Sequence, residues 1–106
     1  MARYISSATT LRYTPTASVS AGDVVVLSDL VTVATHDIPA DALGAVAYHG
    51  EWEIAKGSDT IAQGDAVYWD ATASQITTTA TANTFAGHAS AAASSSDSKV
   101  SVLLNV

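Results

Sequence analysis

Histidines and carboxylates are the residues of this chain best suited to chemistry, and their spacing is the first thing to test. His36, His49 and His88 have Asp37 and Glu51 near them in the sequence. Metal sites built on histidine commonly use pairs two or four residues apart, and no such pair occurs here. The histidines are therefore predicted to be surface residues, with a metal site as the disfavoured alternative.

A Gly-Asp pair occurs twice, each time directly before an apolar burst. Gly22-Asp23 precedes one burst and Gly64-Asp65 precedes another. Glycine allows a positive φ, and aspartate accepts hydrogen bonds from nearby backbone N–H groups, so each pair is predicted to form a structural turn. The alternative is that the two carboxylates meet in an acid–base or calcium site. Calcium loops need several oxygen ligands within a short run, which this spacing does not provide.

Motifs for catalysis are missing from the sequence. There is no Gly-x-Ser-x-Gly elbow, no phosphate-binding glycine loop and no His-Glu-x-x-His helix, and there is no cysteine to act as a nucleophile or metal ligand. The sequence predicts a binding or structural protein, not an enzyme, and no cofactor.

The large aromatic residues leave two interpretations open. Tyr68 and Trp69 point to opposite faces if their segment is a strand, and Trp52 lies on another candidate strand. Together the three are candidates for a sugar-binding platform. Alternatively, Trp52, Trp69 and Phe85 belong to the core or to a protein interface.

The charge balance bears on the choice of partners. Ten acidic residues against four basic ones give a net charge of −6, and the basic residues form no cluster. Such a chain repels phosphate backbones, so no nucleic acid partner is expected. The N-terminus lacks a run of signal-peptide length, and no window is apolar enough for a membrane span, so no membrane association is expected either.

The elements that carry these residues are predicted to be short strands. The length of 106 residues fits one domain, taken here as residues 1–106. Apolar bursts separated by Gly, Asp, Ser, Thr and Pro are typical of all-β proteins. We predict a small antiparallel β-barrel or sandwich with eight or nine strands and little helix, beyond a turn near Pro39. The bursts lie near residues 11–13, 24–27, 30–33, 43–48, 50–54, 66–69, 75–79, 85–91 and 99–104. Residues 1–16 are an N-terminal arm or an edge strand.

A weak internal repeat accompanies this pattern. The segment from Val19 to Val25 matches the segment from Ile61 to Val67 at an offset of 42 residues, with the Gly-Asp pair in common. Two similar halves of a barrel would produce this echo, so a duplication is one interpretation.

These segments, in this order, resemble a family of small phage and prophage proteins described as capsid cement or head decoration proteins. The most specific string is Gln63-Gly64-Asp65 followed by Val67-Tyr68-Trp69-Asp70. The other carriers of the resemblance are Ser20–Val26, Gly44–Gly50, Glu51–Lys56, Ile61–Ala62, Ile76–Ala80, Gly87 and Val100–Leu104. The resemblance implies a compact β-barrel that assembles as a homotrimer on the outside of a phage head, binds the major capsid protein and stabilises the shell. The virion is then its location, after synthesis in the host cytoplasm.

The N-terminal segment is the predicted shell contact. It carries Arg3, Tyr4, Arg12 and Tyr13, which include half of the basic residues of an otherwise acidic chain. These cations complement an acidic patch, and an extended arm can add a strand to a neighbour's sheet edge. Two other functions stay open: a carbohydrate- or cell-surface-binding module of the virion, and a tail or baseplate component.

Overall fold

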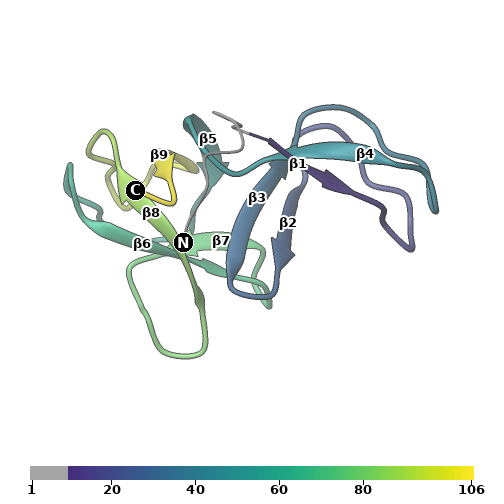
Figure 1. Cartoon of the computed structure of the whole chain (residues 1–106). Helices are drawn as coiled ribbons and strands as arrows, with labels where there is room; N and C mark the ends of the chain where they lie inside the picture. Colours follow the sequence, from purple (N-terminus) through teal and green to yellow (C-terminus); the bar gives the residue numbers. More distant parts are fainter. Residues whose placement is uncertain (1–9) are drawn as a thin grey trace, which may run out of the picture.

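Nine strands in two antiparallel sheets make up the part of the chain that the computed structural model describes, residues 10–106, and no helix occurs there. Figure 1 shows the two sheets side by side. The strands are β1 (Thr10–Tyr13), β2 (Val24–Leu27), β3 (Leu30–Ala34), β4 (Gly44–Ala47), β5 (Glu51–Ala55), β6 (Ala66–Asp70), β7 (Gln75–Thr77), β8 (Thr84–Ala89) and β9 (Lys99–Leu104). The all-β prediction is confirmed, and the strands do not join into one closed barrel.

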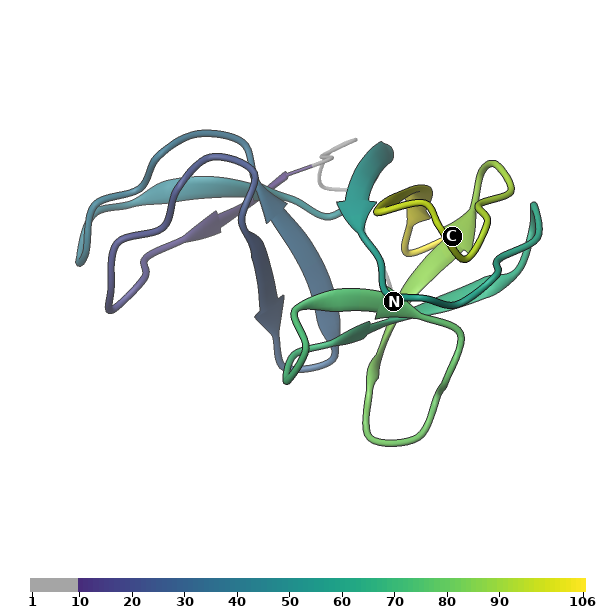
Figure 2. The same ribbon diagram turned by 180° about the vertical axis from the view of Figure 1, so that it is seen from behind.

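The two sheets repeat one topology. The first has the strand order β1-β4-β3-β2, and the second has the order β5-β9-β8-β6-β7. Without β7 the two orders are the same, so β1, β2, β3 and β4 correspond to β5, β6, β8 and β9. We call β1–β4 the N-terminal repeat and β5–β9 the C-terminal repeat. In the views of Figures 1 and 2 they form the two lobes of the molecule.

The turns that start β2 and β6 have the same hydrogen bonds. Asp23 Oδ2 accepts from Ser20 N at 2.9 Å, and Asp65 Oδ2 accepts from Ala62 N at 2.9 Å. The Asp23 carbonyl accepts from Ala34 N, as the Asp65 carbonyl does from Ala89 N. The residue directly before each turn makes an antiparallel bridge, Val19 with Ile38 in one repeat and Ile61 with Ala93 in the other. The echo in the sequence therefore corresponds to a structural repeat.

The apolar core forms two clusters, and the hairpin of β2 and β3 lies between them. Val25 and Ala34 belong to the smaller cluster, inside the N-terminal repeat. Val31 and Val33 belong to the larger cluster, which fills the C-terminal repeat. Both faces of this hairpin are thus covered. A strand with one face in water would alternate apolar and polar residues, whereas Val24–Leu27 is apolar throughout because both of its faces pack against apolar residues.

The strand β7 is an addition to the C-terminal repeat. In the N-terminal repeat the two residues Ser28 and Asp29 connect β2 directly to β3. In the C-terminal repeat β7 pairs with β6 before the chain enters β8. Ile76 of β7 is fully buried in the larger cluster and makes a bridge with Lys56 just after β5.

Candidate interaction surfaces

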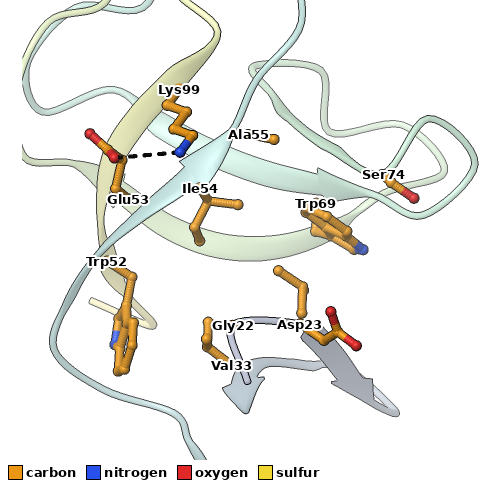
Figure 3. A pocket seen from close by; sticks show the side chains of 11 residues that line it. Gly22, Asp23, Val33, Trp52, Glu53, Ile54, Ala55, Trp69, Ser74 and Lys99 are labelled. Atoms are coloured by element: carbon orange, nitrogen blue, oxygen red, sulfur yellow. Dashed lines mark ion pairs between the residues drawn. The ribbon is translucent and has the colours of Figure 1, made fainter. Parts of the chain in front are cut away.

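A cleft of about 540 Å³ lies between the two repeats and is the best candidate for a ligand site (Figure 3). Trp52 of β5 and Trp69 of β6 line it from the C-terminal repeat, with Ile54 between them. Lys99 Nζ and Glu53 Oε1, 3.9 Å apart, form an exposed ion pair at the rim. The remaining lining residues are Gly22, Asp23, Val24, Val33, Ala55 and Ser74.

The two tryptophans of the cleft also pack against the larger apolar cluster. Trp52 Nε1 donates to the His49 carbonyl oxygen at 3.0 Å, which fixes the orientation of its ring. Tyr68 does not line the cleft. The three aromatic residues predicted to form one sugar platform are therefore divided, with Trp52 and Trp69 on one side of the sheet and Tyr68 on the other, because neighbouring residues of a strand point to opposite faces.

An aromatic cluster covers that other face of the C-terminal repeat. The rings of Tyr68 and Phe85 meet edge to face with centroids 5.8 Å apart, and those of Phe85 and His88 meet in the same way at 5.7 Å. His88 Nδ1 is also hydrogen bonded to the Val106 carbonyl oxygen. Phe85 is 39% exposed and Val106 is 54% exposed, so this face presents apolar surface to solvent. The sequence left Trp52, Trp69 and Phe85 as either core or interface residues, and Phe85 is the exposed one of the three.

The two Gly-Asp pairs lie in turns where glycine is needed. Gly22 has φ +89° and Gly64 has φ +90°, a backbone conformation that side chains with a Cβ rarely adopt. Each aspartate is engaged in its own turn, as described above. Within residues 10–106 no three histidine, aspartate or glutamate side chains come together as they would around a metal ion.

The three histidines have separate local roles. Ala45 N donates to His36 Nε2 at 3.3 Å, while the backbone carbonyl oxygen of His49 accepts the hydrogen bond from Trp52 Nε1. His88 belongs to the aromatic cluster. The structure thus gives each histidine a different neighbourhood.

Two of the four predicted shell-contact residues, Arg12 and Tyr13, lie within the described residues. Arg3 and Tyr4 lie outside the described residues. Arg12 is exposed on β1, an edge strand of the first sheet, whereas Tyr13 is half-buried against the smaller cluster. Of the two interpretations of residues 1–16, the edge strand therefore applies to Thr10–Tyr13.

Lys56 is a buried cation that the sequence analysis missed. Only 6% of it is exposed, and Nζ donates to the carbonyl oxygens of Gly57, Ser94 and Asp97 at 2.7, 2.8 and 3.1 Å. All three ammonium protons are thus bonded, which makes burial of the charge tolerable. The amine fastens the serine-rich loop, residues 90–98, to the end of β5. No sequence signal marks this role, because the acceptors are backbone groups and two of the three, Ser94 and Asp97, lie 38 and 41 residues further along the chain.

Asp59 is the carboxylate with the clearest electrostatic perturbation. Thr77 Oγ1 donates to Asp59 Oδ2 at 2.7 Å, and Thr78 N donates to the same oxygen at 3.1 Å. These two hydrogen bonds, in that order, lower the pKa of Asp59, and the charge of Lys56 lowers it further. The group ties the chain after β7 to the loop after β5. These hydrogen bonds make it a structural carboxylate.

The sequence profile of the phage cement proteins matches residues 5–104 of this chain. The chain belongs to the phage cement protein family. This membership indicates a structural role in association with a phage capsid, and it confirms the resemblance found in the sequence. No curated protein and no solved structure matches this phage cement protein. Its described residues include no helix that is long and apolar enough to cross a membrane.

Proposed function

We propose that this protein is a head decoration protein, which binds the outside of the assembled phage head as a homotrimer and stabilises the shell by bridging major capsid protein subunits. The observation that carries the proposal is the family match over residues 5–104. The fold is compatible with it, because two packed sheets present open strand edges and apolar patches for protein contacts. A trimer bridges subunits through multivalency, since three modest footprints bind as one unit.

The aromatic cluster is the proposed trimer contact. Phe85 and Val106 are exposed on the face of the C-terminal repeat that is turned away from the cleft. Aromatic and apolar side chains of this kind are enriched at the centres of protein interfaces. Phe85→Ser is expected to shift the protein toward monomer in sedimentation at micromolar concentration, whereas Leu43→Ser, at an exposed leucine of the N-terminal repeat, leaves the association unchanged.

The N-terminal segment is the proposed shell contact, through Arg3, Tyr4, Arg12 and Tyr13. Arg12 supports this because it is exposed on an edge strand of a protein with net charge −6. An acidic patch on the shell would attract such a cation, and the outer edge of β1, which no strand within residues 10–106 covers, can form backbone hydrogen bonds with a partner.

Reconstitution on phage heads that lack the protein tests the proposal. The full chain is expected to co-sediment with heads and to raise their resistance to heat. Deletion of residues 2–9, which leaves β1 whole, is expected to abolish binding while the trimer and its melting temperature persist. Arg12→Gln should weaken binding, and Lys99→Gln, which removes an exposed cation of the other sheet, serves as the control. Full binding by the deletion variant contradicts the proposed shell contact, and failure of the intact protein to bind heads contradicts the function.

The cleft supports one alternative function, the binding of carbohydrate. Trp52 and Trp69 offer aromatic surface, and Glu53 and Lys99 offer hydrogen bonds to hydroxyl groups at the rim. Binding of the isolated protein to a glycan array, lost in Trp69→Ala, would favour this alternative over the decoration function.

A further inference from the structure

The strand β2 lacks a neighbour that its counterpart in the other repeat has. In the C-terminal repeat β6 lies between β8 and β7, whereas in the N-terminal repeat β3 is the only strand within residues 10–106 that pairs with β2. In Figures 1 and 2 no other strand of the described chain lies along the outer side of β2. The position that β7 fills in one repeat is therefore open in the other.

The hydrogen-bonding groups at this open edge belong to Val24 and Val26. The Asp23 carbonyl oxygen accepts from Ala34 N, and antiparallel pairing alternates along the strand, so Val25 and Leu27 direct their peptide groups toward β3. Val24 and Val26 direct theirs outward. Tyr68, the counterpart of Val26, pairs in register with Thr77 of β7.

The edge of β2 is short, at four residues, and it lacks the other features that normally protect an edge strand. Val24–Leu27 contains no charge, no proline and no bulge. Leu27 is half-buried at the rim of the smaller cluster, and its counterpart Trp69 lies opposite Ile76, which β7 buries completely. An added strand would cover Leu27 in the same way with one aliphatic side chain.

We infer that the β2 edge accepts an extended segment of the capsid shell subunit, which pairs with Val24–Leu27 where β7 pairs with β6. The inference rests on the proposed function and adds a second contact with the capsid shell to the one through the N-terminal segment. Asp23 and Asp29 are exposed at the two ends of β2, so the segment is expected to carry basic residues beside its aliphatic one. A second copy of this chain is a poorer partner, because pairing β2 with β2 sets these carboxylates against each other.

Hydrogen exchange on head-bound protein tests this inference residue by residue. The full chain is bound to phage heads that lack it, exchanged, quenched and analysed by fragment mass spectrometry. The amides of Val24 and Val26 are expected to exchange at least about tenfold more slowly than in the free protein. Those of Val25 and Leu27 are already bonded to β3 and serve as the internal control.

Two variants separate the edge from its surroundings. Val26→Pro removes the outward N–H while keeping a side chain of similar size, and it is expected to weaken head binding roughly fivefold or more. If that variant fails to fold, Asp29→Asn provides the second test. It is expected to weaken binding, whereas Asp41→Asn, which removes an exposed charge from another loop, leaves binding unchanged.

Each outcome of the exchange experiment has one meaning. Slower exchange at Val24 and Val26 only in the head-bound state supports the inference. Binding to heads with unchanged exchange at both amides overturns the inference and leaves the proposed function intact, whereas absence of head binding overturns both. Protection in the free protein that depends on its concentration identifies a second copy on the edge, and protection independent of concentration identifies the chain's own N-terminal segment. Either of these results also overturns the inference.

Discussion

The side chain of Asn105 donates from Nδ2 to the carbonyl oxygen of Val31 at 3.1 Å and so joins the last residues of the C-terminal repeat to a central strand of the N-terminal repeat. Val31 is fully buried, and β4 pairs with β3 only at Val33 and Ala34. The Asn105 amide therefore supplies a donor where the sheet supplies none. The same nitrogen also donates to the Tyr48 carbonyl oxygen, just after β4, at 2.6 Å. Asn105 is thus a polar link between two repeats that also meet through apolar contacts.

Removal of that amide is expected to destabilise the protein. Asn105 has φ +55°, so Asn105→Gly keeps the backbone conformation accessible and removes only the side chain. A buried carbonyl left without a donor costs about 1–3 kcal/mol, and we expect the free energy of unfolding to fall by that amount in urea denaturation. Asn83→Ala, which removes a hydrogen bond within an exposed loop, is the control and should change the value by less than about 0.5 kcal/mol. Equal effects of the two variants would contradict the role of Asn105.

The glycines are expected to fall into two classes of sensitivity. A Cβ added at Gly22 or Gly64 meets no atom within 4 Å, so Gly→Ala there costs only the strain of a positive φ, about 1–2 kcal/mol and similar in the two turns. A Cβ added at Gly87 would lie 1.9 Å from the Leu103 carbonyl oxygen. Because backbone cannot easily yield, Gly87→Ala is expected to prevent folding or to cost more than about 3 kcal/mol. Thermal unfolding of the three variants measures this, and a mild effect at Gly87 would refute the assignment.

The strands were predictable from the sequence because their signal is local. Each apolar burst identified a strand within a few residues. The Gly-Asp echo similarly indicated two related halves. Short-range features of this kind depend on backbone conformation and on the period of two in a strand.

The pairing of the strands and the roles of single residues were not predictable in the same way. Thr10–Tyr13 stayed open between an arm and an edge strand, because its partner β4 lies more than 30 residues further along the chain. Lys56 follows an alternating strand and looks like any exposed cation until the serine-rich loop folds over it. The sequence also placed Tyr68 and Trp69 on opposite faces without indicating which face meets the core. These facts depend on contacts between distant segments.

Lys56 is expected to be essential for the order of the serine-rich loop. Lys56→Met keeps the length of the side chain but leaves the carbonyl groups of Gly57, Ser94 and Asp97 without their donor, so we expect a loss of about 2–4 kcal/mol. Hydrogen exchange should accelerate first in residues 94–98. Lys99→Met is the matched control, since Lys99 is 61% exposed and its ion pair should contribute less than about 1 kcal/mol. A melting temperature of Lys56→Met equal to that of the control would refute this role of Lys56.

The pH dependence of stability is expected to carry a contribution from Asp59. Its folded pKa is lowered, first by the Thr77 hydroxyl and then by Thr78 N–H, so the unfolded chain binds the proton more tightly than the folded chain does. The stabilisation is therefore complete above the ordinary aspartate pKa of about 3.9 and is lost as the pH falls through the folded value. Urea denaturation between pH 2 and pH 6 measures this slope. Asp59→Asn should make stability less dependent on pH in the acid range, whereas Asp29→Asn, an exposed carboxylate in the turn before β3, removes the same charge without those hydrogen bonds. If the acid slope of Asp59→Asn equals that of the unmodified protein, Asp59 does not carry this part of the stability.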